Sequence, residues 1–114
     1  MKRHIALHSA AVAAIAGLLC LAAPATAADA AAAEALAKKS NCMKCHSVSA
    51  KKEGPAFKET AAKYKGKADG EKKLIAHLTT NPKIKVDGKE EEHDNLKTKN
   101  SADVLNVVQW ILAQ

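Results

Sequence analysis

Two cysteines and a histidine stand close together in the middle of the chain, as Cys42-Met43-Lys44-Cys45-His46. Thiols at this spacing can add across the two vinyl groups of a haem, and the adjoining imidazole then lies where it can coordinate the iron. The motif therefore predicts covalent attachment of one haem c through Cys42 and Cys45, with His46 as an iron ligand.

Two other kinds of chemistry can use the same cysteines. A thioredoxin-like dithiol needs a strand before the motif and a βαβ unit around it, whereas the Ala-rich segment before Cys42 favours a helix. A zinc site needs further ligands, which His77 or His93 could supply. We favour haem attachment because the histidine directly follows the second cysteine and because the chain carries the signs of export described next.

The N-terminal residues have the three parts of a secretory signal peptide. Positive charge in residues 1–4 precedes an apolar run over residues 10–23, and residues 24–27 end in the A-x-A pattern of a cleavage site. We predict cleavage after Ala27, which removes Cys20 and leaves residues 28–114 as one periplasmic domain. No second apolar run of about 20 residues follows, so we expect no membrane span in that domain.

The charge and size of residues 28–114 argue against several classes of protein. Without Lys2 and Arg3 the chain keeps 16 lysines, no arginine and 12 acidic residues, a formal net charge of +4. Because arginine forks are absent, we expect no nucleic-acid partner. No Ser-His-Asp set, catalytic carboxylate pair or phosphate-binding loop is visible, so we expect no enzyme. A domain this small has little apolar core, so a bound haem is expected to help it fold.

Helices are expected to position the motif, and we predict an all-α fold of about four short helices around one haem. The first helix runs into Cys42, a break at Gly54-Pro55 separates it from the second, and the last has a wide apolar stripe with Trp110 beside it. The pattern predicts helices at residues 28–41, at 57–65, from a cap at Asp69 to Asn81-Pro82, and from a cap at Ser101 through Leu112.

The stretch from Pro82 to Asn100 has neither a helical period nor an alternating strand pattern. It contains three successive glutamates at 90–92 and a turn signal at Asp87-Gly88. We therefore expect a long loop. Loops of this length in small domains usually have a function.

Together these segments resemble the small bacterial class I c-type cytochromes. The resemblance covers residues 29–114 and is carried by the Cys42–His46 motif, by Gly54-Pro55-Ala56-Phe57-Lys58, by Ala61-Ala62-Lys63-Tyr64-Lys65-Gly66 and by Trp110 near the end of the last helix. It implies that the Pro55 carbonyl accepts a hydrogen bond from the ring of His46, the proximal iron ligand. It also implies that the first and last helices cross beside the haem, with packing residues Leu36, Leu105, Val108 and Trp110.

The sequence departs from this family at the sixth iron ligand. Family members take a methionine from the loop before the last helix, but the only methionines here are Met1 and Met43. Met1 leaves with the signal peptide, and Met43 sits between the two anchored cysteines. His93 stands in the loop position of the family's methionine and is our leading candidate for the distal ligand. The alternatives are His77, Asn95 or an open sixth position.

The resemblance implies a periplasmic one-electron carrier that exchanges electrons with redox partner proteins and acts as a monomer. A second imidazole in place of methionine is expected to lower the reduction potential, because methionine ligation raises it. Lysines near the motif could guide partners with acidic surfaces; they are Lys44, Lys51, Lys52 and Lys58. The alternative function is the binding or sensing of a small gas, NO, CO or O₂, at a labile or open sixth position.

Overall fold

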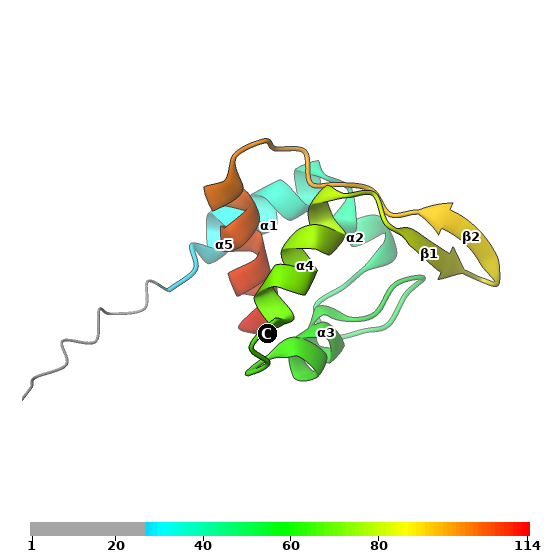
Figure 1. Cartoon of the computed structure of the whole chain (residues 1–114), viewed down its shortest axis with the longest axis horizontal. Coiled ribbons are helices and arrows are strands. Elements are labelled where there is room, and N and C mark those ends of the chain that lie inside the picture. Colours follow the sequence, from blue (N-terminus) through cyan, green and yellow to red (C-terminus); the bar gives the residue numbers. More distant parts are fainter. Residues whose placement is uncertain (1–26) are drawn as a thin grey trace, which may run out of the picture.

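Helices form the body of the chain in the computed structural model, which describes residues 27–114 (Figure 1). This confirms the predicted all-α class. The predicted signal peptide lies outside the described residues except for Ala27. In the described part the elements are α1 (Ala30–Lys39), α2 (Cys42–Cys45), α3 (Phe57–Tyr64), α4 (Gly70–Thr79), β1 (Lys83–Val86), β2 (Lys89–Glu92) and α5 (Ser101–Leu112).

The sequence predicted that the first helix runs into the haem motif. In the structure the helix stops before the motif. Asp29 caps α1 by accepting a hydrogen bond from the Ala32 amide at 3.0 Å, and the helix ends at Lys39. Asn41 then adopts φ 61°, a left-handed conformation that asparagine tolerates better than most residues. The two cysteines therefore lie on a helical turn of their own, α2.

One predicted helix cap is a different residue in the structure, and another is at the predicted residue but lacks a side-chain capping bond. The cap of α5 is Asn100 rather than Ser101, because the Asn100 side chain accepts a hydrogen bond from the Ala102 amide at 2.9 Å. Asp69 precedes α4 but makes no capping bond. Its carboxylate instead pairs with Lys73 at 2.7 Å, one turn along the helix.

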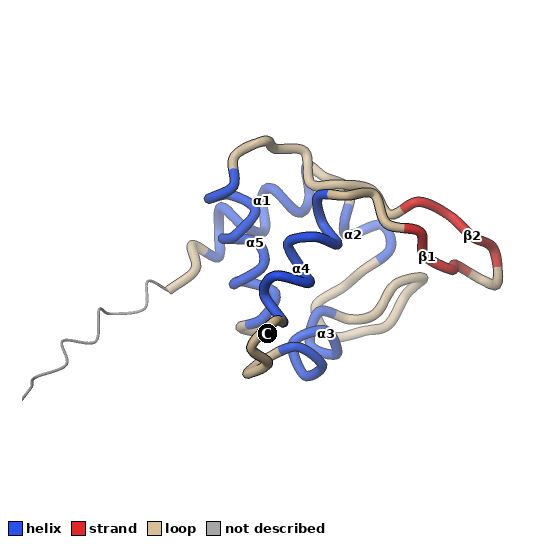
Figure 2. The backbone as a smooth tube through the Cα atoms, in the orientation of Figure 1, coloured by secondary structure: helices blue, strands red, loops and turns tan. Residues whose placement is uncertain are grey.

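A β-hairpin follows α4, which corrects the prediction of a long loop without strands (Figure 2). Strands β1 and β2 pair antiparallel, and the chain reverses at Asp87-Gly88, where both residues have positive φ, 49° and 79°. Asp-Gly suits such a turn because both positions of a type I′ turn need positive φ. The sequence prediction missed the alternation of charged and apolar residues in β1, which covers only four residues. In β2 all residues are charged and exposed, so they cannot alternate between apolar and polar.

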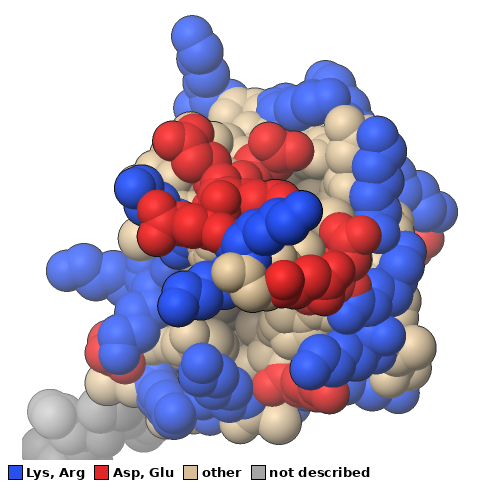
Figure 3. Space-filling model, turned by 90° about the vertical axis from the view of Figure 1, so that its right-hand side faces the viewer, with Lys and Arg blue, Asp and Glu red and all other residues tan. Residues whose placement is uncertain are grey.

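Charged side chains cover the hairpin end of the molecule. Figure 3 looks at this end and shows carboxylates gathered near its middle, with lysines around them. Lys83 of β1 pairs with Glu90 of β2 at 2.8 Å across the hairpin. Charges on exposed strands disfavour edge-to-edge pairing with other chains, so this end is poorly suited to forming a larger sheet.

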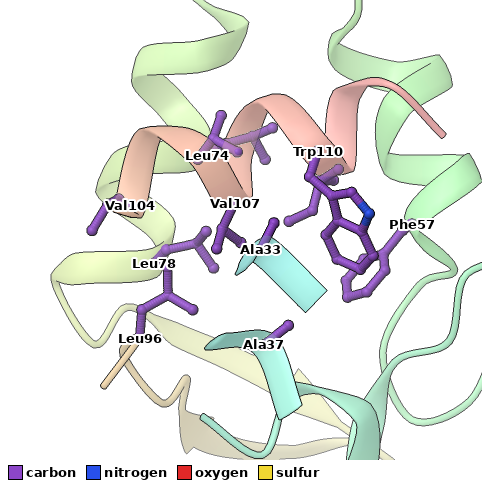
Figure 4. Packing of buried hydrophobic residues seen from close by; sticks show 11 residues of the cluster. Ala33, Ala37, Phe57, Leu74, Leu78, Leu96, Val104, Val107 and Trp110 are labelled. Atoms are coloured by element: carbon purple, nitrogen blue, oxygen red, sulfur yellow. The ribbon is translucent and has the colours of Figure 1, made fainter. Parts of the chain in front are cut away.

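The hydrophobic core lies between α1, α3, α4 and α5 (Figure 4). Small residues of α1, Ala33 and Ala37, let this helix approach α5 closely, as the resemblance implied. Phe57 meets Trp110 edge-on with ring centroids 5.3 Å apart. Of the four implied packing residues, Val108 and Trp110 are buried, while Leu36 and Leu105 are half-buried. The core members are Ala33, Ala37, Phe57, Leu74, Leu78, Leu96, Val104, Val107, Val108, Trp110 and Ile111.

Candidate haem-binding site

The short helix α2 presents both cysteines of the motif as free thiols that are neither fully buried nor fully exposed. Burial raises the pKa of Cys42. A hydrogen bond from Cys45 Sγ to a Glu53 carboxylate oxygen, at 3.3 Å, is the main cause that raises the pKa of Cys45. The two sulfur atoms are not joined to each other, so each can form a thioether bond.

His46 follows α2 directly and is oriented by the main chain of Pro55. Its Nδ1 donates a hydrogen bond to the Pro55 carbonyl oxygen at 2.7 Å, which is the contact implied by the resemblance. Because a carbonyl can only accept, Nδ1 carries the proton and Nε2 is the nitrogen left to bind a metal. A carbonyl partner on the other ring nitrogen is the usual means of fixing a ligating histidine.

Gly54 and Phe57 both lie against the His46 ring. The Phe57 ring stacks on it with centroids 5.3 Å apart and an angle of 18°. Gly54 comes so close that a Cβ atom there would collide with His46 Cε1, Nδ1 and Nε2. In the sequence Gly54 is interpreted only as a break between helices. The structure shows that glycine is needed there because any side chain would displace the ring.

His93 comes directly after β2, and its ring lies near the ring of His46, with centroids 6.1 Å apart. Imidazole nitrogens bind a metal at about 2.0–2.1 Å, so two imidazoles on opposite sides of one metal atom have centroids roughly 6 Å apart. Burial and the nearby His46 lower the pKa of His93, which keeps its imidazole in the neutral form that ligates metals. The spacing of the two rings therefore fits one haem iron between them.

His77, the second candidate for the distal position, lies on α4 and packs against His93. Their ring centroids are 4.3 Å apart at an angle of 53°. Burial lowers the pKa of His77, and the neighbouring His93 and His46 lower it further. Among the described residues the ring contacts run from His46 to His93 and from His93 to His77, so His93 stands between the other two.

Asn95, the third candidate, has its side chain engaged with Asn81. Its Oδ1 accepts a hydrogen bond from the main-chain amide of Asn81 at 2.8 Å, and its Nδ2 donates to the side-chain oxygen Oδ1 of Asn81 at 2.7 Å. Asn81 in turn donates through Nδ2 to the His93 carbonyl at 3.1 Å. Asn95 therefore acts within a hydrogen-bond network beside His93, a role that the sequence alone does not suggest.

The surroundings of the two cysteines differ from those of a thioredoxin-like dithiol and of a zinc site. Helix α1, not a strand, precedes Cys42 in the described chain, whereas a thioredoxin-like pair follows a strand. Within residues 27–114 no three His, Cys, Asp or Glu residues are grouped so that they could hold a metal ion.

Comparison with known proteins decides the family. The chain matches the family described as Cytochrome c over residues 30–114. It belongs to the cytochrome c family. Its single Cys42–His46 motif means that this cytochrome carries one haem c, and the proteins of this family are electron carriers rather than enzymes.

Among curated proteins, this cytochrome is similar to cytochrome c-551 of Allochromatium vinosum, with 51% identity over 38% of this chain and 46% of that protein. It is also similar to cytochrome c2 of Rubrivivax gelatinosus, with 37% identity over 68% of this chain and 91% of that protein. The matched part spans about half the length of the c-551 relatives and about a third of the length of the c-552 relatives.

Two solved structures confirm the class I fold. Class 1 cytochrome MtoD from Sideroxydans lithotrophicus ES-1 is 49% identical, with a TM-score of 0.73 over 76% of this chain and 97% of that chain. Cytochrome c552 of Nitrosomonas europaea is 33% identical, with a TM-score of 0.54 over 69% of this chain and 95% of that chain. In residues 27–114 none of the helices has the length and apolar character needed to cross a bilayer.

Proposed function

We propose that this cytochrome c is a monomeric, periplasmic one-electron carrier whose iron has two histidine ligands, His46 and His93. The observation that carries the proposal is the 6.1 Å separation of these two rings. Cys42 and Cys45 hold the haem through thioether bonds. When bound, the haem supplies an iron that cycles between the ferric and ferrous states.

The residues around the site have distinct parts in this function. The Pro55 carbonyl fixes the tautomer of His46 and makes its Nε2 more basic. His93 would bind the iron in place of the family's methionine, which would keep external ligands away from it. A second imidazole lowers the reduction potential relative to a His/Met cytochrome. The resulting carrier suits partners that work at lower potential.

Spectroscopy of the ferric protein and of the His93→Ala variant tests this ligation. We expect a low-spin EPR spectrum for the unmodified protein, without the weak near-infrared absorption of a sulfur–iron bond. The ferrous protein should bind CO slowly because the sixth position is filled. His93→Ala should become high-spin and bind CO readily. A high-spin spectrum in the unmodified protein contradicts the proposal and favours gas binding instead.

We also propose that residues 1–27 are a signal peptide and that residues 28–114 form the cytochrome domain in the periplasm. The family match begins at residue 30, just after the proposed cleavage site. Covalent haem attachment takes place outside the bacterial cytoplasm, which agrees with export. N-terminal sequencing of the purified holoprotein should begin at Ala28. A protein that keeps residues 1–4 contradicts this proposal.

The redox partner, we further propose, presents acidic groups to lysines near the haem motif. The side chains of Lys44, Lys51, Lys52 and Lys58 are exposed. Lys52 is held close to the motif, since its Nζ donates to the Met43 carbonyl at 2.6 Å. The bimolecular electron-transfer rate should fall as added salt shortens the Debye length to about 10 Å. A rate that is insensitive to salt contradicts this mode of docking.

A further inference from the structure

We propose that the side chains of Asn81 and Asn95 form a clamp that holds His93 at the iron and sets how readily the sixth position opens to an external ligand. This inference rests on the proposed ligation by His93 and adds the residues that position it. It assigns to Asn95 a positioning role rather than ligation.

The clamp consists of two hydrogen bonds between Asn81 and Asn95, one from a main-chain amide and one between the two carboxamides. Asn95 Oδ1 accepts from the Asn81 amide at 2.8 Å, and Asn95 Nδ2 donates to Asn81 Oδ1 at 2.7 Å. Both polar atoms of each side chain are in use, because Asn81 Nδ2 donates to the His93 carbonyl at 3.1 Å. The two residues thus close the open end of the hairpin, with His93 held inside the closure.

Asn81 and Pro82, which precede β1, hold both polar groups of the His93 main chain. Its carbonyl accepts from Asn81, and its amide donates to the Pro82 carbonyl at 2.8 Å. Beyond the clamp, the Leu96 amide donates to the Leu78 carbonyl of α4 at 3.0 Å. Leu78 and Leu96 are both buried in the core. The backbone of His93 is therefore tied to the rigid part of the molecule.

The backbone of Asn81 is itself held in an uncommon conformation. Its φ of 46° lies in the left-handed region, where asparagine is among the few residues other than glycine that occur readily. Residues in such conformations persist when their surroundings hold them. Here three hydrogen bonds of Asn81, two to Asn95 and one to His93, supply that support.

The ring of His93 lacks the hydrogen bond that orients the ring of His46. His46 Nδ1 is bonded to the Pro55 carbonyl, whereas His93 Nδ1 is buried and has no hydrogen-bond partner among the described residues. The position of His93 must then come from its main chain and from packing against His77. Loosening the main chain should therefore release the distal ring more readily than a change in the surroundings of Nδ1.

The test is the rate of CO binding to the ferrous holoprotein, since CO can bind only after His93 leaves the iron. Asn95→Ala removes two hydrogen bonds of the clamp, and we expect CO to bind about tenfold faster. The ferric EPR spectrum should stay low-spin with shifted g values, because His93 still ligates the iron but is held less firmly.

Asn106→Ala is the matched control. Asn106 forms a similar clamp far from the hairpin, accepting from the Asp29 amide at 2.8 Å and donating to the Asp29 carbonyl at 2.9 Å. Its loss also removes two hydrogen bonds and should lower Tm by a similar amount. The CO rate and the EPR spectrum should stay as in the unmodified protein.

A double-mutant cycle provides a second probe. Asn81→Gly removes the other carboxamide while keeping a residue that accepts positive φ. If the two residues act as one clamp, the double variant binds CO no faster than the faster single variant. Equal CO rates in Asn95→Ala, Asn81→Gly and unmodified protein would overturn the clamp while leaving His93 as ligand. A low-spin spectrum unchanged by His93→Ala overturns both.

Discussion

The two sides of the proposed iron site are built in different ways. On the proximal side, His46 receives its contacts from residues that follow closely in the chain, Pro55, Gly54 and Phe57. On the distal side, His93 is placed by the hairpin and held by α4 and by residues on either side of the hairpin. The proximal ring is fixed through its own nitrogen and the distal ring through its backbone.

This difference gives the two proposed ligands different roles. A ring that is stacked, hydrogen-bonded and flanked by two covalent anchors has little freedom to leave the iron. The ring of His93, at the base of an exposed hairpin, depends on a few main-chain hydrogen bonds, and such segments open more easily than the core. We therefore expect the distal side to be the one that controls access to the iron.

The largest effect is expected from loss of the haem attachment, which disrupts the proximal and the distal side together. Replacing Cys42 and Cys45 with Ala should leave a chain without covalent haem and largely unfolded, because the remaining apolar residues cannot offset the entropy of the chain. Far-UV circular dichroism measures the loss of helix. Acid–acetone treatment of the unmodified protein should leave the colour on the polypeptide. Haem that extracts freely, or zinc in its place, contradicts the proposed attachment.

His93→Met should change the distal side while leaving the fold intact. If His93 already points at the iron, a thioether in its place should restore the absorption of a sulfur–iron bond and raise the reduction potential. Optical spectroscopy and protein-film voltammetry measure the two effects. His77→Met is the control and should leave both unchanged. An unchanged potential in His93→Met would mean that the side chain at this position does not reach the iron.

Gly54→Ala should disturb the proximal side alone. The added Cβ collides with the His46 ring, and overpacking of this kind costs about 1–3 kcal/mol of unfolding free energy. Chemical denaturation measures the loss, and a shifted Soret band should accompany it. Gly66→Ala is the control, since nothing lies within 4 Å of its added Cβ and only its positive φ is unfavourable. A shifted Soret band in the control would contradict the assignment to His46.

The proximal half was predictable from the sequence because its information is local. The Cys42–His46 motif and the Gly54-Pro55 break stand close enough in the chain to be interpreted together. The helices also follow from apolar periodicity, as in the stripe around Val108. The main error on this side is that Gly54 is seen only as a break, since its contact with the His46 ring depends on how the loop folds back.

The distal half was predictable only in part. The position of His93 comes from the resemblance, but the hairpin before it was missed because β2 is uniformly charged and the alternation in β1 covers only four residues. Asn95 has the chemistry of a weak ligand when it is considered alone. Its actual partner, Asn81, lies on the other side of the hairpin, so the contact appears only once the pairing of the strands is known.

The smallest effect is expected from a substitution that distinguishes the role of His77 from that of His93. His77→Ala removes the ring that packs on His93 but not the main-chain bonds that hold it. We therefore expect the ferric iron to stay low-spin, with a loss of about 1 kcal/mol of stability from the lost packing of a half-buried ring. EPR and thermal unfolding measure the two quantities. His77→Phe keeps an aromatic ring in contact with His93 and should recover most of the stability. If His77→Ala becomes high-spin while His93→Ala remains low-spin, the distal ligand is His77, and the hairpin serves only to cover it.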